Sequence, residues 1–458
     1  MRRSPRNREQ FSDAEVDRVA RTLGTAPLAA YTTPIVYPWA VQNFATRPMA
    51  ARPSPQTGRL RLYVHIPFCH YHCTFCFYAV RTGAKRAEME RYVDALAREL
   101  EWIRPGAALT QLVVGGGTPT ALPPELLDRV LAAIVERTAP PAADACTLEA
   151  SPDSLTAAHI RILQQRGIGR VSIGIESMDD AVLGTVHRRH TPAQGLAACR
   201  MAADAGLALN VDLIYGLPGQ TEESFRRDLA AVAECGARTL CLYALRLNEK
   251  TPVAKQLSAA DRLDLARLMR WRAFVTRAAA EVGYVQTRSY TYKRADSGPS
   301  WHERAVAASD GPRHELGIGM SARSQLDDVV YRNHDQCDVY MDRVEHGHSP
   351  VESVFELDVR DRKTQFIAAS LGNGKALDRA SYERAFGVSI DADFAALLER
   401  LRAAELVDDD NVCIVLTETG KLVYDRVLLC FYPDRATKWL HTWAARPRRA
   451  AATTQLER

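Results

Sequence analysis

Leu60 to Tyr78, with the sequence LRLYVHIPFCHYHCTFCFY, is the stretch that decides the fold of this chain. Its first part, Leu60 to Ile66, is mainly apolar or aromatic and predicts a buried strand. Pro67 ends that strand because proline has no backbone N–H to donate to a neighbouring strand. A loop with three cysteines in C-x3-C-x2-C spacing follows, and these are Cys69, Cys73 and Cys76. Three thiols so close together predict one soft metal centre, for which iron–sulfur and zinc are the candidates.

Two metal centres fit this loop. The first is a structural Cys3His zinc site, for which the available fourth ligands are His65, His70 and His72. Zinc knuckles are usually built from paired C-x2-C units, and the loop has no second pair. The second is a [4Fe–4S] cluster, in which three cysteines leave one iron open for a substrate or cofactor. The spacing favours the iron–sulfur centre, with the three cysteines as metal ligands and as catalytic residues.

The composition is that of an ordinary globular protein. The chain has 458 residues, 47% hydrophobic and 25% charged, which is enough for two or three units around a substantial core. A net charge of +4 is small for this length and gives no reason to expect a nucleic-acid or membrane partner. No apolar run is long enough to span a bilayer. The cysteines outside the loop are scattered without paired spacing, which predicts reduced, buried thiols and a cytoplasmic location.

From residue 59 onwards, apolar runs of strand length alternate with amphipathic segments at intervals of ~30 residues, as expected for βαβ units. The predicted strands are 60–66, 110–114, 145–149, 170–175, 208–214 and 239–243. The predicted helices are 86–103, 123–137, 156–166, 191–205 and 221–235. This α/β pattern predicts six parallel strands with crossover helices. They form either a doubly wound sheet or a partial barrel, and periodicity does not choose between the two.

Changes of composition predict five units along the chain. These are an N-terminal arm (1–55), the barrel (56–255), a barrel extension with a substrate-facing segment (256–350), a cap (351–446) and a disordered tail (447–458). The cap has three helical segments followed by two short strands, which predicts a winged-helix-like α+β domain. It has no dense basic recognition helix, so we do not expect it to bind DNA.

The barrel extension begins with a long helix predicted over 259–282. After this helix in the sequence come aromatic and basic residues that we place at the mouth of the pocket, namely Tyr290, Tyr292, Trp301, His302 and Arg304. Such side chains can stack on a flat aromatic substrate or can simply pack within the protein.

The carboxyl ends of the predicted strands carry unusual residues. The second strand is followed by three glycines, Gly115 to Gly117, and by Thr118, a pattern that suits a polar ligand lying against bare backbone. Three other apolar strands end in a carboxylate, and these are Glu149, Glu176 and Asp212. A buried carboxylate is costly unless it faces a ligand or forms an ion pair, for which Arg170 and Arg188 are available. Because the carboxyl ends of parallel strands meet at one edge, these residues predict a single site.

With these residues placed, the chain resembles the radical S-adenosylmethionine (SAM) enzymes, and among them the family of the oxygen-independent coproporphyrinogen III oxidase. The resemblance covers nearly the whole chain, from Tyr31 to Tyr432. Besides the cysteine loop, its markers are GGGTPT at 115–120, SIGIES at 172–177 and NVDLIYGLPGQT at 210–221. The resemblance implies a partial (β/α)6 barrel of TIM type. It also implies that the three cysteines bind three irons of a [4Fe–4S] cluster whose fourth iron binds SAM, which is cleaved to a 5′-deoxyadenosyl radical.

The resemblance further implies which residues bind SAM. Those matching its methionine end are Gly116, Gly117 and Thr118, and those matching its amino, carboxylate and ribose groups are Glu149, Arg188 and Asp212. The remaining positions of the cluster and adenine pocket are Tyr63, Phe75, Glu176 and the backbone near Ala244. A second SAM beside the first and an electron donor such as flavodoxin or ferredoxin are also implied.

Two departures from the family determine the predicted activity. The oxidase has a further cysteine two positions after the third, where this chain has Tyr78, and a glutamine where it has Glu176. The missing cysteine argues against oxidative decarboxylation of coproporphyrinogen. We therefore predict transfer of a methyl or methylene group from a second SAM to an sp2 carbon of an aromatic or unsaturated small molecule, as in natural-product tailoring. The alternatives are coproporphyrinogen III oxidation and haem binding, trafficking or ring opening.

Overall fold

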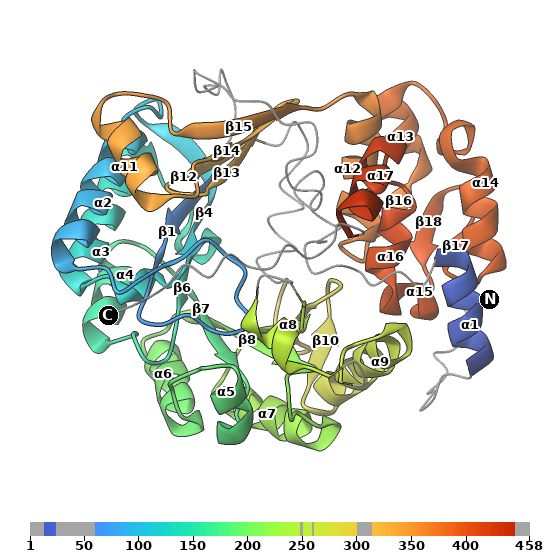
Figure 1. Cartoon of the computed structure of the whole chain (residues 1–458), viewed down its shortest axis with the longest axis horizontal. Helices are drawn as coiled ribbons and strands as arrows, with labels where there is room; N and C mark the ends of the chain where they lie inside the picture. Colours follow the sequence, from blue (N-terminus) through green and yellow to red (C-terminus); the bar gives the residue numbers. More distant parts are fainter. Residues whose placement is uncertain (1–12, 24–59, 248–250, 259–260, 300–313, 445–458) are drawn as a thin grey trace.

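A curved sheet with six central parallel strands forms the main part of the molecule (Figure 1). The computed structural model describes residues 13–23, 60–247, 251–258, 261–299 and 314–444. The central strands are β1 (Leu60–Ile66), β4 (Ala107–Gly116), β6 (Cys146–Ala150), β7 (Arg170–Glu176), β8 (Ala208–Tyr215) and β9 (Thr239–Ala244). They lie side by side in chain order and every pair is parallel. A doubly wound sheet reverses its strand order, so this order selects the partial barrel and confirms the predicted fold class.

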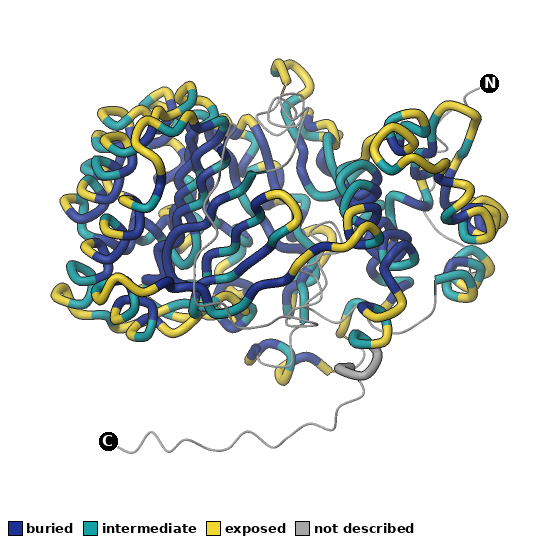
Figure 2. Tube along the Cα trace, turned by 90° about the horizontal axis from the view of Figure 1, so that it is seen from above, coloured by how far each residue is buried: buried dark blue, intermediate teal, exposed yellow. Residues whose placement is uncertain are grey.

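Amphipathic helices cover the outer face of the barrel (Figure 1). They are α2 (Arg86–Leu100), α3 (Pro124–Arg137), α4 (Ala157–Gln165), α6 (Pro192–Asp204) and α7 (Glu222–Glu234). The predicted helices lie at these positions, and α4, α6 and α7 each begin with a threonine whose side chain accepts from the third helical N–H. The sequence pattern did not predict the short α5 (Asp180–Thr185). Buried residues line the strands and the inner faces of the helices, as Figure 2 shows.

The sheet extends beyond the six central strands at both edges. Next to β9 it adds β11 (Thr291–Arg294) and β10 (Tyr284–Gln286), both antiparallel. Next to β1 it adds β12 (Glu315–Ile318) in parallel, and then the antiparallel strands β13 (Arg323–Leu326), β14 (Val329–Asn333) and β15 (Val351–Glu356). These strands have three to six residues and include several polar residues, which is why their periodicity was too weak to predict them.

Short elements complete the barrel. They are β2 (Phe68–Cys69), β3 (Arg81–Thr82), β5 (Thr138–Ala139), two 3-10 turns (Pro119–Ala121 and Ala143–Ala145), α8 (Pro252–Gln256) and α11 (Cys337–Glu345). The long helix predicted over 259–282 is α9, which begins at Leu265 and ends at Glu281.

The C-terminal part has the predicted order of three helices followed by a hairpin. The helices are α12 (Val359–Leu371), α13 (Arg379–Phe386) and α14 (Ile390–Ala403), and the hairpin is β17 (Val407–Asp409) with β18 (Cys413–Leu416). A two-residue strand, β16 (Leu377–Asp378), pairs with β18. Three short helices follow, namely α15 (Glu418–Leu422), α16 (Tyr424–Leu429) and α17 (Asp434–Ala444).

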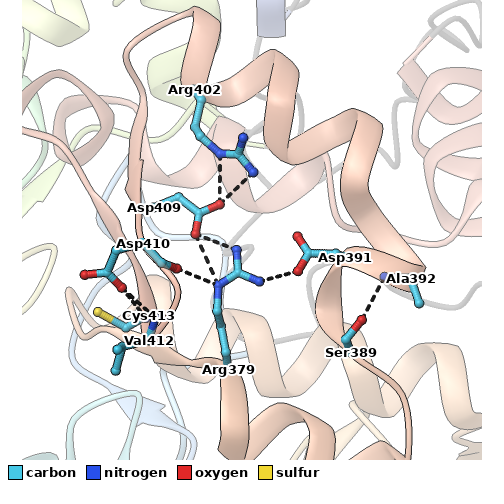
Figure 3. Close-up of polar contacts among 9 residues, drawn as sticks. All are labelled: Arg379, Ser389, Asp391, Ala392, Arg402, Asp409, Asp410, Val412 and Cys413. Atoms are coloured by element: carbon cyan, nitrogen blue, oxygen red, sulfur yellow. Dashed lines mark hydrogen bonds and ion pairs between the residues drawn. The ribbon is translucent and has the colours of Figure 1, made fainter.

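One guanidinium ties this hairpin to the helices, as Figure 3 shows. Arg379 donates to Asp409 of β17, to the Asp410 carbonyl oxygen (2.8 Å) and to Asp391 of α14. Arg402 donates to the other Asp409 oxygen at 2.8 Å. Asp409, whose side chain is only 3% exposed, is therefore shared by two guanidiniums that fix the hairpin against the helices.

Helix α9 joins the two parts of the molecule. Its Arg272 donates to both carboxylate oxygens of Asp425 in α16, at 3.0 and 2.6 Å, and lies 4.7 Å from the ring centroid of Tyr424. The side chains of this ion pair are only 10% and 13% exposed. Helix α1 (Asp13–Leu23) packs here as well, because Val19 is fully buried in the same core. Residues 13–23 of the predicted arm are thus a packed helix, whereas the rest of the arm and the predicted tail (447–458) lie outside the described residues.

Among the described residues, no helix combines the length and the apolar character needed to cross a lipid bilayer.

Candidate functional site

The cysteine loop is fastened to the glycine segment at the carboxyl end of the barrel. The Gly117 N–H donates to the Ile66 carbonyl and the Thr118 N–H to the Phe68 carbonyl, both at 2.8 Å. The end of the loop lies beside its start, because β3 pairs in parallel with β2. On its far side, the Thr74 N–H donates to the Val186 carbonyl at 3.1 Å. Backbone hydrogen bonds therefore hold the cysteine loop at this end of the barrel, and these bonds do not depend on the identity of the side chains.

The three thiols are partly buried and lie close to hydrogen-bond donors. Cys69 Sγ lies 3.5 Å from the Thr118 hydroxyl, and Arg188 donates to Cys73 Sγ at 3.8 Å. Burial raises the pKa of all three thiols, most strongly for Cys76, to about 12. Arg188 opposes this rise at Cys69 and Cys73 because its positive charge favours the thiolate. A guanidinium at this place fits an anionic thiolate-ligated centre.

The arrangement does not fit one zinc ion. Zinc ligands must all lie about 2.0–2.3 Å from one point, and the described residues include no group of three or more His, Cys, Asp or Glu side chains able to hold one ion. His65 bonds instead with the Tyr63 hydroxyl (3.1 Å) and the Ala79 carbonyl (3.3 Å), and His70 lies 3.6 Å from Asp153. In an iron–sulfur cluster each cysteine binds a different iron, so the thiols need not converge on one point.

The glycine segment leaves backbone bare beside the loop. Gly116 has φ +119°, which favours glycine, and a Cβ there would lie 2.7 Å from His65 Nδ1. A Cβ on Gly117 would lie 2.6 Å from the Pro67 carbonyl oxygen. A Cβ on Gly115 would collide with the Glu149 carboxylate. The three glycines are therefore required by the close approach of other groups of the protein, whereas the predicted contact of this stretch with a polar ligand stays a prediction.

Three carboxylates converge near these glycines. Glu149 accepts from the Gly116 N–H at 3.1 Å, and Asp212 accepts from Ser172 (2.9 Å) and Asn210 (2.8 Å). Burial raises the pKa of Glu149 to about 7, and the charge of Asp212 adds to the rise. Burial likewise raises the pKa of Asp212. Carboxylates that repel one another in a desolvated place favour a cationic ligand, which would let them ionise at neutral pH.

Glu176 forms an ion pair with Arg188, which was the alternative to a ligand-facing role in the prediction from the sequence. It lies 3.7 Å from Arg188, and both side chains are almost buried, 13% and 8% exposed. Its φ of +69° and a register shift between β7 and β8 turn it out of the regular strand. Burial still raises the pKa of Glu176 to about 7, although Arg188 opposes the rise. The pair leaves Arg188 Nε buried without a hydrogen-bond partner in the described structure.

The other predicted site residues lie around this edge. Tyr63 is in β1 with its hydroxyl on His65, and Ala244 ends β9 opposite Tyr215 of β8. Phe75 packs in an apolar cluster with Val182, so its predicted place in the adenine pocket stays a prediction. The SAM-binding roles of all these residues also stay predictions.

The predicted pocket-mouth residues fall into two groups. Tyr290 stacks beside Tyr243 of β9, with ring centroids 5.0 Å apart, and Tyr292 is buried, 3% exposed. Trp301, His302 and Arg304 lie outside the described residues.

One polar residue of the site, Asp153, was missed from the sequence, and the contacts of Arg170 were not predicted. Arg170, which was named as an ion-pair partner, is buried at the start of β7 and donates to Thr147 (3.3 Å) and Thr239 (3.4 Å). Its positive charge lowers the pKa of both Glu149 and Asp212. Asp153 accepts from the Tyr71 hydroxyl of the cysteine loop at 3.2 Å. Asp153 follows the same strand as Glu149, so the search for carboxylates at the ends of apolar strands could have predicted it as well.

Comparison with known proteins identifies the domain. Residues 63–232 match the model of the radical SAM superfamily. The chain is 29% identical over 399 residues to the oxygen-independent coproporphyrinogen III oxidase of Escherichia coli K12, with 81% of this chain and 85% of the relative covered. It is 26% identical over 386 residues to the haem chaperone HemW of Lactococcus lactis, with 80% and 97% covered. The solved structure of the E. coli coproporphyrinogen III oxidase has a TM-score of 0.71 at 28% identity and covers 83% of this chain and 91% of its own.

These comparisons establish part of the predicted function and correct the rest. The chain contains a radical SAM domain and is homologous to the oxidase and the haem chaperone, and the cofactors of this superfamily are the predicted [4Fe–4S] cluster and SAM. The prediction of a methyl- or methylene-transferring enzyme is wrong, because the relatives that align with four fifths of the chain are an oxidase and a chaperone. Tyr78 in place of a cysteine was too little to decide the reaction.

Proposed function

We propose that this protein is a radical SAM enzyme that oxidises a porphyrinogen-type tetrapyrrole without oxygen, in the manner of coproporphyrinogen III oxidase. One observation carries the proposal. The cysteine loop, the glycine segment and three half-buried carboxylates meet at one edge of a barrel whose relative of 29% identity is such an oxidase. The barrel and the C-terminal unit are both spanned by that similarity, which covers 81% of the chain.

Each group of residues has a defined task in this proposal. Cys69, Cys73 and Cys76 hold the cluster, and the bare backbone at Gly116 and Gly117 lets SAM lie close to it. Glu149 and Asp212 accept hydrogen bonds from the positively charged and hydroxyl groups of SAM, and Arg188 donates to its carboxylate. When bound, the cluster and SAM supply one-electron cleavage of a sulfonium bond and removal of a hydrogen atom from the substrate. A second SAM beside the first stays a prediction.

A stacked aromatic pair supports a substrate that carries pyrrole rings. The Phe77 and Tyr78 rings lie with centroids 4.8 Å apart at 27°, and 37% and 61% of the two residues are accessible to water. Desolvation nevertheless raises the pKa of Tyr78 to about 12, Glu149 adds to the rise, and Arg246 opposes it. The Tyr78 ring is therefore accessible to water and lies close enough to Glu149 and Arg246 to feel their charges. Such a pair can stack on a pyrrole ring system, and Arg246 supplies a positive charge for propionate arms.

The reaction at each oxidised propionate balances as follows. A hydrogen atom leaves the carbon next to the ring and is taken up by the radical derived from SAM. The carboxylate leaves as carbon dioxide, one electron passes to an external one-electron acceptor, and a vinyl group remains. Arg246 near the mouth would hold a propionate that is not reacting.

A second candidate is haem binding, because the chain aligns with 97% of the HemW sequence at 26% identity. A carrier would bind haem tightly and would not need to consume SAM.

One experiment separates the oxidase proposal from haem binding. The protein is reconstituted anaerobically with iron and sulfide and is then incubated with SAM, a reductant and coproporphyrinogen III. The oxidase proposal predicts 5′-deoxyadenosine, carbon dioxide and a vinyl-bearing product in matching amounts. Haem binding at micromolar affinity or tighter without 5′-deoxyadenosine from any tetrapyrrole would overturn it. A Tyr78→Phe variant keeps the stacking ring and serves as the matched control, whereas Tyr78→Ala is expected to raise KM more than it lowers kcat.

A further inference from the structure

A cavity of about 540 Å³ opens beside the cysteine loop, and no residue of the six central parallel strands lines it. Its lining comes from the cysteine loop, from the turn after β3 and from the turn after α5, and consists of His70, Tyr71, His72, Thr82, Gly83, His187, Arg188 and Arg189. Among the residues that line this cavity, only Arg188 has a proposed role in binding SAM or the substrate.

Only the cysteine loop separates this cavity from the thiols. His70 and His72 are both exposed, and each is the sequence neighbour of a cluster cysteine, Cys69 and Cys73. Arg188 reaches from the cavity wall to Cys73 Sγ at 3.8 Å. The cavity wall therefore contains the direct neighbours of Cys69 and Cys73 and the guanidinium that contacts the Cys73 thiol.

The cavity and its rim are cationic. Arg189 stacks over Tyr71, 5.1 Å from the ring centroid, and within the described residues it has no carboxylate partner. Lys85, two residues beyond Gly83 at the start of α2, also has no carboxylate partner among them. The acidic group facing the cavity wall is Asp153, which already accepts from Tyr71 at 3.2 Å and lies 3.6 Å from His70. Three exposed imidazoles, His70, His72 and His187, line the same cavity.

We propose that this face receives an acidic one-electron carrier protein, which docks with its redox centre over the cysteine loop. The proposal rests on the proposed function, because cleavage of each SAM consumes one electron that the chain itself does not supply. One electron passes from the reduced carrier to the cluster, so the carrier is oxidised and the cluster reduced by one electron, and no bond forms or breaks in this step. An acidic partner is favoured because opposite charges steer association and fix the orientation of the complex.

A protein partner fits this surface better than a small ligand does. The histidines that line the cavity are exposed, so a small molecule bound there would keep much of its surface in water. Within the described residues, Arg189 on one turn and Lys85 at a helix start instead present unpaired charge on two separate segments, as suits a transient redox complex. Docking on the opposite end of the barrel would place the whole length of the strands between the carrier and the cluster.

Charge reversal tests the proposal. Arg189→Glu and Lys85→Glu change the rim, and Arg238→Glu is the matched control, because Arg238 is an exposed arginine just before β9 at the amino end of the strands. The first readout is binding of flavodoxin to the cluster-free chain, measured at low and high salt. The second is SAM cleavage driven either by reduced flavodoxin or by dithionite, a small reductant that needs no docking surface.

We expect the Arg189 and Lys85 variants to weaken flavodoxin binding by about tenfold at low salt, with smaller effects at high salt where charges are screened. Cleavage driven by flavodoxin should fall in parallel, while dithionite-driven cleavage stays unchanged and the Arg238 variant behaves like the wild type. Equal binding by all variants, or equal losses with both reductants, would overturn the docking face. Absence of dithionite-driven cleavage in the wild type would instead refute the proposed function, and the binding measurement would still judge the docking face.

Discussion

Replacing Glu149 with glutamine is expected to stabilise the cofactor-free protein above neutral pH and, at the same time, to weaken SAM binding. Glutamine has the same shape and its amide oxygen can still accept from the Gly116 N–H, at 3.1 Å in the wild type. What it removes is the negative charge, which burial and the nearby Asp212 disfavour. A buried charge kept for a ligand costs stability when that ligand is absent.

The size of the effect follows from the pKa. The pKa of Glu149 rises from its ordinary 4.5 to about 7 in the folded protein, which corresponds to about 3 kcal/mol at ~1.4 kcal/mol for each pH unit. Between these two values the folded state binds more protons than the unfolded state, so the wild type loses stability as the pH rises. The loss is complete above about pH 7. The gain from Glu149→Gln should therefore be about 1 kcal/mol at pH 5.5 and about 3 kcal/mol at pH 8.

Denaturant unfolding of the cluster-free chain at several pH values measures this gain. Glu136→Gln is the control, because Glu136 is exposed on the barrel helix α3, and it should change the free energy of unfolding by less than about 0.5 kcal/mol at every pH. SAM binding to the reconstituted Glu149→Gln protein should weaken by about ten- to hundredfold, the usual loss of a charged hydrogen bond. A gain that is the same at pH 5.5 and pH 8, or a loss of stability at pH 8, would refute the reasoning about a carboxylate held ionised at a cost.

Three further predictions concern the cluster, the cofactor loop and the contact between the two parts of the chain. Cys73→Ser should lose iron and visible cluster absorption after anaerobic reconstitution, whereas Cys413→Ser should keep both, because that thiol lies in the C-terminal hairpin far from the loop. Gly117→Ala should lower SAM affinity by about tenfold or more, since its Cβ would lie 2.6 Å from a backbone carbonyl oxygen. The control is Gly184→Ala, whose Cβ would meet no atom within 4 Å, and it should bind SAM as the wild type does. Arg272→Ala breaks the buried ion pair of α9 and should lower the free energy of unfolding by about 3–5 kcal/mol, and an unchanged denaturation midpoint would contradict this.

The secondary structure of the barrel was accessible from the sequence because each strand and helix has its own periodicity. The strand predicted over 60–66 is β1 at the same residues, and the helix predicted over 123–137 is α3 within one residue. The cysteine loop was equally legible, since its spacing is a local property of the chain. The extra strands were not, because β12 pairs with β1 across some 250 residues and gains its burial only from that partner.

Glu99 shows what only the tertiary structure can reveal. In the sequence it is an ordinary glutamate near the end of a predicted helix. In the structure it is fully buried and accepts from the Gly319 N–H (2.7 Å), from Asn333 (2.9 Å) and from Tyr340 (2.7 Å). It thereby ties the turn after β12 to the helix behind the cysteine loop. No local pattern announces this role, because its three partners lie more than 200 residues away.

By itself, the sequence showed the cysteine loop, the glycine segment, the six strands and the carboxylates at their ends, because each of these depends on neighbouring residues and their spacing. Only the tertiary structure decided that the strands pair in chain order into a partial barrel, since pairing joins residues that are far apart in the chain. It also decided the ionisation of the site. The pKa values of Glu149 and Glu176 rise to about 7 because folding removes water from them and brings Asp212 close, and neither effect exists before the strands meet.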